Sequence, residues 1–285
     1  MSLGTVLQVS GLAKHFGGVR ALDGVDFSVS AGQCVALIGP NGAGKSTCFA
    51  CLAGQQVPTA GEVLWQGQSL LGKPPAERQR LGVARTFQVA QTFEALTVLQ
   101  NIQLVLRSAQ PLAWWDRLDR RQPERALRLA AQAGLQAQAH TTVADLPYGA
   151  KKRLELAMAL AGLPDAVPGS GADQGAHSAP SLLLLDEPAA GLALAERADM
   201  MALVRQVAAQ GVTVLYTEHN MDAVFGVADR VLVLMQGRLV ADGLPEAVAQ
   251  DPQVRERYLG MDFDPNVNVK PDAKLDAKGL LDALR

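Results

Sequence analysis

The fold is decided by the run Gly39-Pro40-Asn41-Gly42-Ala43-Gly44-Lys45-Ser46-Thr47, which matches the phosphate-binding pattern G-x-x-x-x-G-K-[ST]. The apolar residues Cys34–Ile38 predict a strand before it. A helix is expected from Lys45 to Ala53, with Gly54 placed to end it. In that setting the glycines let backbone N–H groups converge on phosphate oxygens, and the helix N-terminus adds a positive dipole end. The run therefore predicts a binding loop for a purine nucleoside triphosphate.

Two side chains of this loop have specific expected roles. Lys45 would reach the β- and γ-phosphates, and the hydroxyl group of Ser46 would bind Mg²⁺. The remaining residues expected to contact the nucleotide are Gly39, Asn41, Gly42, Ala43, Gly44 and Thr47.

A second part of the site is predicted where Leu182–Leu185 lead into Asp186 and Glu187. The four leucines are typical of a buried strand, and a carboxylate at its end beside the phosphate loop suits Mg²⁺ held through water. This is the role expected of Asp186, whereas Glu187 could polarise an attacking water molecule. Two adjacent acids also occur in solvated turns, but the apolar lead-in favours the nucleotide site.

The rest of the chain alternates between strand and helix patterns. Continuous apolar runs suggest a parallel sheet that is buried on both faces. Helices are expected from Thr97 to Arg107, where Thr97 and Gln100 fit a capping box, and then from Glu124 to Gln132, Lys152 to Leu160 and Ala195 to Ala208. The expected strands, besides Cys34–Ile38, are Val6–Ser10, Val25–Val29, Glu62–Trp65, Val83–Phe87, Leu182–Leu185, Val212–Tyr216 and Val231–Met235.

Composition limits the classes of protein that fit. The 285 residues include 26 Lys and Arg, 28 Asp and Glu, and 48% hydrophobic residues, which is a globular composition without the basic excess of a nucleic-acid binder. Three cysteines cannot form a disulfide framework, and the C-x-x-C spacing of Cys48 and Cys51 has no second cluster to complete a metal site. The longest apolar runs are far shorter than a membrane span. We therefore expect a soluble, reduced, cytoplasmic protein.

Three segments are harder to interpret. Residues 162–180, rich in Gly, Pro, Ala and Ser, are expected to form a flexible surface loop. Residues 261–285 are expected to form a loosely ordered, acidic-leaning tail. Trp114 and Trp115 are followed by a stretch rich in Asp and Arg, Asp116 to Arg121. They fit either an amphipathic helix with a solvated face or a docking surface for another subunit.

Several motifs together resemble the nucleotide-binding subunits of ABC transporters, over roughly residues 5 to 260. Leu146-Pro147-Tyr148-Gly149-Ala150 occupies the place of the signature motif, usually LSGGQ, and the phosphate loop, the signature, Asp186-Glu187 and His219 follow one another in the family's order. The resemblance implies an α/β fold: a P-loop NTPase core, in which helices flank a mixed sheet, with an antiparallel β subdomain and an inserted helical subdomain at about residues 92–160. It also implies a single cassette over residues 1–260.

The resemblance assigns further residues. Gln88 is similar to the Q-loop glutamine, which implies catalysis and Mg²⁺ binding, and His219 is similar to the switch histidine that senses the γ-phosphate. Phe16 lies where the family stacks an aromatic ring on adenine. Gly149 begins the helix expected to cover the nucleotide of a second cassette. Together with Glu187 these residues imply ATP hydrolysis in a two-cassette sandwich that closes on ATP and opens after hydrolysis. Each of these assignments depends on the motif order, since a lone Gln, His or Phe is more often structural.

Departures from the family pattern bear on the strength of the signature. Pro147 replaces the usual Ser of the signature, Ala150 replaces its Gln, and Ala193 replaces an Asp or Asn downstream of the strand-end acids. These replacements suggest a signature that contributes less than usual. The hypothesis is therefore that a homodimer is slow and a heterodimer with a partner cassette is the working form, with either kind of dimer left open.

Some runs narrow the transporter class. Val83-Ala84-Arg85-Thr86-Phe87-Gln88 and Glu218-His219-Asn220-Met221 are similar to importer cassettes for branched-chain amino acids. Cassettes of urea and short-chain amide importers share most of these features, and some ABC ATPases act outside transport, so both remain alternatives. The resemblance implies transmembrane permease subunits and a second ATP-binding cassette as partners, with no nucleic acid. It also implies an indirect link to a periplasmic substrate-binding protein and a peripheral place on the inner face of the cell membrane.

Overall fold

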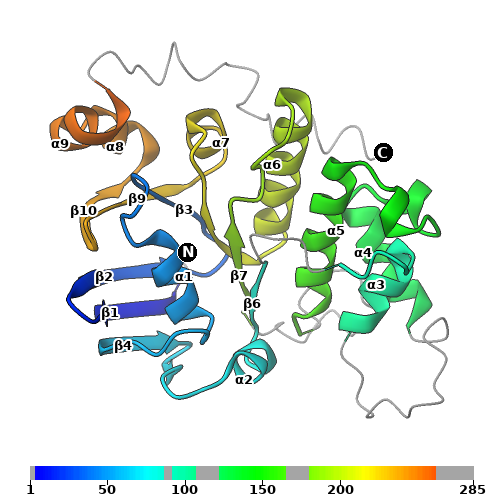
Figure 1. Ribbon diagram of the computed structural model, residues 1–285, viewed down its shortest axis with the longest axis horizontal. Coiled ribbons are helices and arrows are strands. Elements are labelled where there is room, and N and C mark those ends of the chain that lie inside the picture. The colour runs from blue at the N-terminus through cyan, green and yellow to red at the C-terminus, as the bar shows by residue number, and fades with distance from the viewer. Residues whose placement is uncertain (1–3, 87–91, 107–121, 165–179, 261–285) are drawn as a thin grey trace.

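The computed structural model describes residues 4–86, 92–106, 122–164 and 180–260 of the chain, and the strands in these ranges form two sheets (Figure 1). The strands are β1 Thr5–Phe16, β2 Val19–Ser30, β3 Cys34–Ile38, β4 Ala60–Trp65, β5 Gln68–Ser69, β6 Val83–Arg85, β7 Leu182–Asp186, β8 Thr213–Thr217, β9 Arg230–Met235 and β10 Arg238–Gly243.

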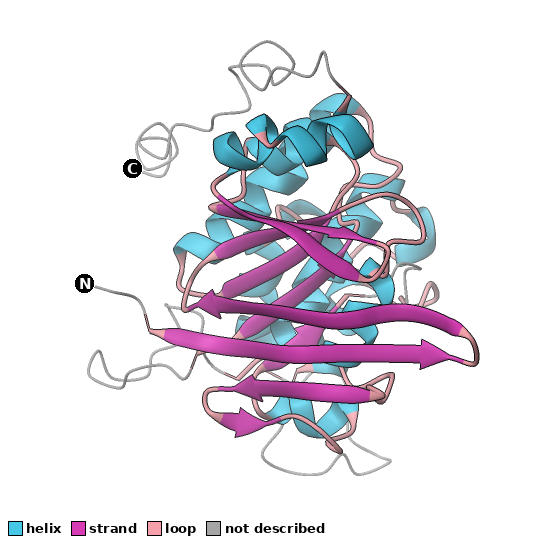
Figure 2. Ribbon diagram, turned by 90° about the vertical axis from the view of Figure 1, so that its left-hand side faces the viewer, coloured by secondary structure: helices cyan, strands magenta, loops and turns pink. Residues whose placement is uncertain are grey.

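The larger sheet is mixed, as expected. Its order is β10-β9-β3-β8-β7-β6, in which β10 alone pairs antiparallel with its neighbour and the remaining pairs are parallel. The carboxyl ends of the parallel strands therefore meet at one edge, where open α/β sheets bind their ligands. The smaller sheet, β2-β1-β4-β5, is antiparallel, and its two long strands cross the full width of the view in Figure 2.

Some helices lie against the mixed sheet, and others form a separate group beside it. They are α1 Lys45–Leu52, α2 Pro75–Arg80, α3 Val98–Val105, α4 Pro123–Gln132, α5 Tyr148–Ala161, α6 Leu194–Ala209, α7 Met221–Phe225, α8 Pro245–Gln250 and α9 Pro252–Val254, with 3₁₀ turns at Gln136–Gln138 and Val143–Asp145 and a π-helical turn at Arg255–Leu259. In Figure 1 α3, α4 and α5 lie together at one side of the sheet, which is the inserted helical part that the sequence predicts.

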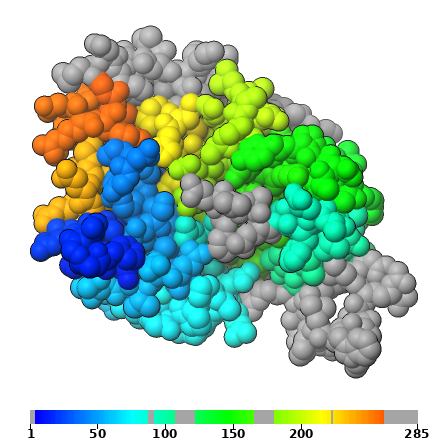
Figure 3. Space-filling model, in the orientation of Figure 1, coloured from blue at the N-terminus to red at the C-terminus, as the bar shows by residue number. Residues whose placement is uncertain are grey.

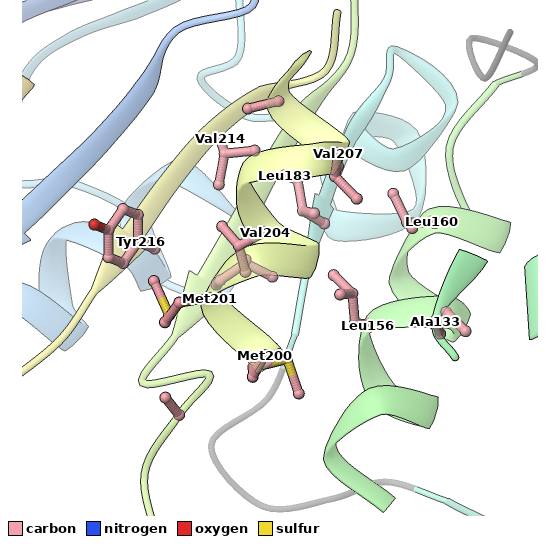
Figure 4. Packing of buried hydrophobic residues seen from close by; sticks show 14 of the residues in the cluster. Ala133, Leu156, Leu160, Leu183, Met200, Met201, Val204, Val207, Val214 and Tyr216 are labelled. Atoms are coloured by element: carbon pink, nitrogen blue, oxygen red, sulfur yellow. The ribbon is translucent and has the colours of Figure 1, made fainter. Parts of the chain in front are cut away.

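Strand β3 is buried on both of its faces. Cys34, Ala36 and Ile38 belong to one hydrophobic cluster, and Val35 and Leu37 belong to a second one. Alternation along the strand explains this division, because successive side chains point to opposite sides of a sheet. Figure 4 shows part of the first cluster, in which side chains of α6 and α5 face those of β7 and β8. The two clusters fix the strand that leads into the phosphate loop.

The expected elements within the described residues are present, with shifted ends. The capping box of α3 is formed: the hydroxyl oxygen of Thr97 accepts a hydrogen bond from the N–H of Gln100 at 3.2 Å, and the Gln100 side chain accepts one from the N–H of Thr97 at 2.9 Å. Helix α5 begins at Tyr148, four residues before the predicted start at Lys152.

Several elements were not expected from the sequence. They are β5, β10, α2, α7, α8 and α9. Strand β10 lies at the edge of the sheet and consists only of exposed and half-buried residues, so its apolar pattern is weak.

Parts of the chain named above lie outside the described residues. These parts are Phe87 and Gln88, Trp114 and Trp115, most of the segment 162–180, and the tail 261–285. Among the described residues no helix is both long and apolar enough to cross a membrane.

Candidate functional site

The phosphate loop joins the end of β3 to the start of α1, as predicted. Gly39 has φ 145° and Gly44 has φ 107°, which are conformations that residues with a Cβ rarely adopt. A Cβ at Gly39 would also overlap the carbonyl oxygen of Leu234, and one at Gly44 would overlap that of Ala21. The loop therefore requires glycine at both positions. Asn41, Gly42 and Ser46 are exposed, Thr47 is half-buried and Ala43 is buried.

Lys45 is held inside this loop. Its Nζ donates hydrogen bonds to the carbonyl oxygens of Gly39 at 2.6 Å and Pro40 at 3.0 Å. Burial lowers the pKa of Lys45, an effect that Glu187 and Asp186 oppose because their negative charges favour the protonated amine. The lysine and both acids thus act on one another across the carboxyl edge of the sheet.

Asp186 ends β7 with both carboxylate oxygens engaged. Oδ1 accepts a hydrogen bond from the hydroxyl group of Thr217 at 2.8 Å, and Oδ2 accepts one from Nη2 of Arg85 at 2.8 Å. The N–H of Asp186 points to the hydroxyl oxygen of Thr86 at 3.3 Å. These contacts fix the carboxylate, which is 3% exposed, from the two neighbouring strands.

Glu187 and His219 are brought together, although 32 residues separate them. Glu187 leaves the strand with φ 48°, and its N–H donates to the carbonyl oxygen and the hydroxyl oxygen of Thr217 at 3.2 and 3.1 Å. Its Oε1 lies 2.9 Å from Nε2 of His219. The carboxylate is 23% exposed and the imidazole 42% exposed, so a small molecule can reach the pair.

Glu218 supports this pair through backbone hydrogen bonds, a role that sequence reasoning missed. Its carboxylate is 3% exposed and accepts hydrogen bonds from the N–H of Ala189 at 2.8 Å and of His219 at 3.2 Å. Burial raises the pKa of Glu218, although the hydrogen bonds from the backbone lower it in part. The carboxylate ties the turn after Glu187 to the residues that follow β8.

The signature segment lies elsewhere in the chain. Gly149 is buried in the first turn of α5 against Glu196 of α6, and Pro147 stands immediately before the helix. Tyr148 is 52% exposed, and its hydroxyl group lies 3.4 Å from the carbonyl oxygen of Ala190. Figure 1 places α5 apart from α1, and in Figure 3 the N-terminal strands and α3–α5 occupy opposite sides of the visible face. Gly149 is therefore not brought to the phosphate loop of its own chain.

The two remaining candidates have different outcomes. Phe16 ends β1 with 46% of its surface exposed, and Nζ of Lys14 lies 4.9 Å from its ring centroid. The exposed ring is available for stacking. Gln88 lies outside the described residues.

The donor set fits Mg²⁺ bound together with a nucleotide. Ser46 and Asp186 offer hydroxyl and carboxylate oxygens, which this hard cation prefers, and Mg²⁺ commonly takes one or two protein oxygens and completes its shell with phosphates and water. Among the described residues no group of three or more His, Cys, Asp or Glu could hold a metal ion by itself.

A cavity of about 410 Å³ opens beside β6. Residues of α2, β6, α3 and α5 line it, among them Gln79, Ala84, Arg85, Val105 and Met158. Arg85 belongs both to this cavity and to the contact with Asp186.

Comparison with known proteins agrees with this geometry. Residues 22–167 match the family model described as ABC transporter. The chain is 35% identical over 265 residues to the high-affinity branched-chain amino acid transport ATP-binding protein BraF of Pseudomonas aeruginosa, covering 90% of this chain and 98% of the relative. LivG of Escherichia coli, of the same description, matches at the same identity and coverage.

Solved structures agree as well. A nucleotide-free ATP-binding cassette from an ABC transporter matches with a TM-score of 0.76 and 28% identity, covering 90% of this chain and 100% of that one. An ADP conformation of such a cassette matches with a TM-score of 0.76 and 30% identity, covering 90% and 99%.

Proposed function

The chain belongs to the ABC transporter family, and we propose on that premise that it is the ATP-hydrolysing subunit of an importer for branched-chain amino acids. The observation that carries this proposal is the pair of Glu187 and His219, 2.9 Å apart, at the sheet edge that also holds Lys45 and Asp186. A carboxylate oriented by an imidazole, next to a phosphate loop, suits the activation of a water molecule for attack on a terminal phosphate.

Each residue of the site has a defined task in this proposal. The backbone of the loop and the N-terminus of α1 hold the phosphates, and Lys45 offsets their charge. Ser46 and Asp186 hold Mg²⁺, which supplies charge neutralisation for the phosphates. Glu187 polarises the attacking water, and His219 orients Glu187 and holds the γ-phosphate. Phe16 stacks on the adenine ring, and Gln88 contributes near the metal.

Two cassettes work together in this proposal. The start of α5, including Gly149, lies away from the phosphate loop of its own chain. In the proposal it therefore covers the nucleotide that a second cassette binds. Pro147 and Ala150 reduce what this signature offers, so we propose a heterodimer as the working form. Equal ATPase rates of the isolated chain and of the assembled complex would contradict the heterodimer.

The proposed substrate class follows the relatives. BraF and LivG are described as branched-chain amino acid transport proteins, and the chain covers 98% of each. The partners proposed are transmembrane permease subunits, which receive the cassette at the inner face of the membrane, and a substrate-binding protein on the far side. The cavity beside β6 is the surface proposed for the permease, since the apolar side chains of Val105, Met158 and Phe93 line it, and Phe93 is 58% exposed.

The decisive variant is Glu187→Gln. Its matched control is Glu246→Gln, because Glu246 is an exposed residue in the first turn of α8. Glu187→Gln keeps the shape of the side chain but cannot accept a proton from water. We expect it to bind ATP while steady-state hydrolysis falls at least about a hundredfold. Glu246→Gln is expected to hydrolyse ATP like the unmodified chain. Unchanged hydrolysis by Glu187→Gln would refute the role given to Glu187.

Transport is tested separately from hydrolysis. Cells that carry the chain with its permeases and binding protein are expected to take up labelled leucine, and cells with Glu187→Gln are expected to lose this uptake. Uptake of labelled urea instead of leucine would move the substrate class to short-chain amides.

A further inference from the structure

Arg85 lies beside the proposed metal site but has no role in the hydrolysis proposed above. It is the last residue of β6, which pairs in parallel with β7, so its side chain emerges at the same sheet edge as Asp186. Nη2 of Arg85 lies 2.8 Å from Oδ2 of Asp186, and the two side chains are only 11% and 3% exposed. This is a buried ion pair at the phosphate-binding edge of the sheet.

The guanidinium group is fixed on its other sides as well. Nη1 of Arg85 donates a hydrogen bond to the side-chain oxygen of Gln55, and the group lies 5.8 Å from the ring centroid of Phe49 in α1. Its Nε is buried and has no hydrogen-bond partner among the described residues. Arg85 is thus held between the helix of the phosphate loop and β7, and it cannot leave Asp186 without breaking these contacts.

A buried carboxylate needs a compensating charge, because transfer from water into the protein interior strongly disfavours the ionised form. Lys45 also interacts electrostatically with Asp186, but its amine is bound by the loop carbonyls, where phosphates are expected. Arg85 is therefore the cation that pairs directly with Asp186 and remains there when the phosphates bind Lys45. Each carboxylate oxygen has a second lone pair, so the contacts from Arg85 and Thr217 still leave sites for a water-bridged metal.

We propose that Arg85 is a positioning residue that supplies the counter-charge of Asp186, so that ATP can enter the site before Mg²⁺ does. This inference rests on the proposed function. Without the guanidinium group the charge of Asp186 would face the phosphates directly and repel them. Mg²⁺ would remove most of this repulsion, so the loss of Arg85 would weaken ATP binding mainly when the metal is absent.

The test compares ATP affinity with excess EDTA and with excess Mg²⁺, measured by titration of a fluorescent ATP analogue. Arg85→Met keeps much of the side-chain volume and removes the charge. We expect its affinity to fall by roughly tenfold or more in EDTA, since one uncompensated charge acts at close range, and by only a few-fold in Mg²⁺. Arg85→Lys is expected to retain most of the affinity in EDTA.

A double variant decides whether Arg85 acts through Asp186. In Arg85→Met/Asp186→Asn the repelling charge is gone, so affinity in EDTA is expected to return close to that of the unmodified chain. The matched control is Arg153→Met, because Arg153 of α5 forms its ion pair with Asp199 of α6, at 3.0 Å, and not with Asp186. It is expected to bind the nucleotide normally in both conditions.

Two results would overturn the proposal. One is an equal loss of affinity in EDTA and in Mg²⁺. The other is a double variant, Arg85→Met/Asp186→Asn, that binds ATP in EDTA no better than Arg85→Met alone. If Arg85→Met does not fold, the same comparison is made with Arg85→Gln, which is less apolar in the buried position. Absence of ATP binding by the unmodified chain would instead refute the proposed function, so the two failures are distinguishable.

Discussion

Thr217 connects the two acids of the site, and its replacement by Val is a sensitive test of the geometry. Its hydroxyl group donates to Oδ1 of Asp186 at 2.8 Å and accepts from the N–H of Glu187 at 3.1 Å, and the residue is 1% exposed. Val has nearly the same shape as Thr but no hydroxyl group, so the substitution removes two hydrogen bonds and leaves the packing intact.

The size of the effect follows from these contacts. A hydrogen bond to a charged group contributes about 1.5–3 kcal/mol. The N–H of Glu187 keeps the carbonyl oxygen of Thr217 at 3.2 Å, and Asp186 keeps Arg85, so neither group is left without a partner. We therefore expect Thr217→Val to lower the free energy of unfolding by roughly 2–3 kcal/mol, without a large additional penalty.

The assay is urea unfolding at pH 7, followed by circular dichroism, with Thr217→Ser as the matched control. Ser keeps the hydroxyl group and loses one buried methyl group, which contributes about 1 kcal/mol. The expected order of stability is the unmodified chain, then Ser, then Val. If Val is as stable as Ser or more stable, the hydroxyl group does not carry the connection between Asp186 and Glu187.

Three further predictions concern the loop, the buried acid and the thiols. Gly39→Ala should reduce nucleotide affinity at least about tenfold, because its Cβ would overlap the carbonyl oxygen of Leu234 at a φ of 145°; normal affinity in a nucleotide titration would contradict this. Burial raises the pKa of Glu218 above its usual 4.5, so the folded chain binds this proton more tightly than the unfolded chain does. Its contribution to stability is therefore lost as the pH rises from about 4.5 through the raised pKa, and Glu218→Gln should flatten this part of the pH profile of unfolding; an unchanged slope would refute the assignment. Burial raises the pKa values of Cys34 and Cys48 to about 12, so these thiols should not react with a thiol reagent at pH 8 until the chain unfolds. Rapid labelling of the native chain would contradict the burial of these two cysteines in the core.

The parts of the site that could be predicted from the sequence are those with local causes. The glycines and Lys45 form one continuous run, and the leucines before Asp186 mark a buried strand without reference to any neighbour. The capping box at Thr97 is likewise a matter of spacing alone, and the structure forms it. The order of motifs in a family assigned His219 to the γ-phosphate, but it did not predict the contact with Glu187, which lies 32 residues away in the sequence.

Other parts depend on register and could not be predicted. Thr217 reaches Asp186 because the two are directly paired across β7 and β8, and no local pattern reveals that pairing. Arg85 reads as an ordinary charged residue near the end of a strand, and its burial depends on α1 and β7 packing around it. Glu218 similarly reads as a solvent-exposed acid until the turn at Ala189 covers it.

The order of strands in the mixed sheet has a consequence for folding of the chain during its synthesis. Strand β3, near the start of the chain, lies between β8 and β9, and the carbonyl oxygen of Leu234 in β9 abuts the first glycine of the phosphate loop. During synthesis the loop emerges long before its neighbours, and pairing of such distant segments is intrinsically slow. A chain that ends before β9 therefore has the complete loop sequence but lacks the strand against which the loop packs. We therefore expect a chain to bind ATP only after residue 235 has been synthesised and β9 has paired with β3.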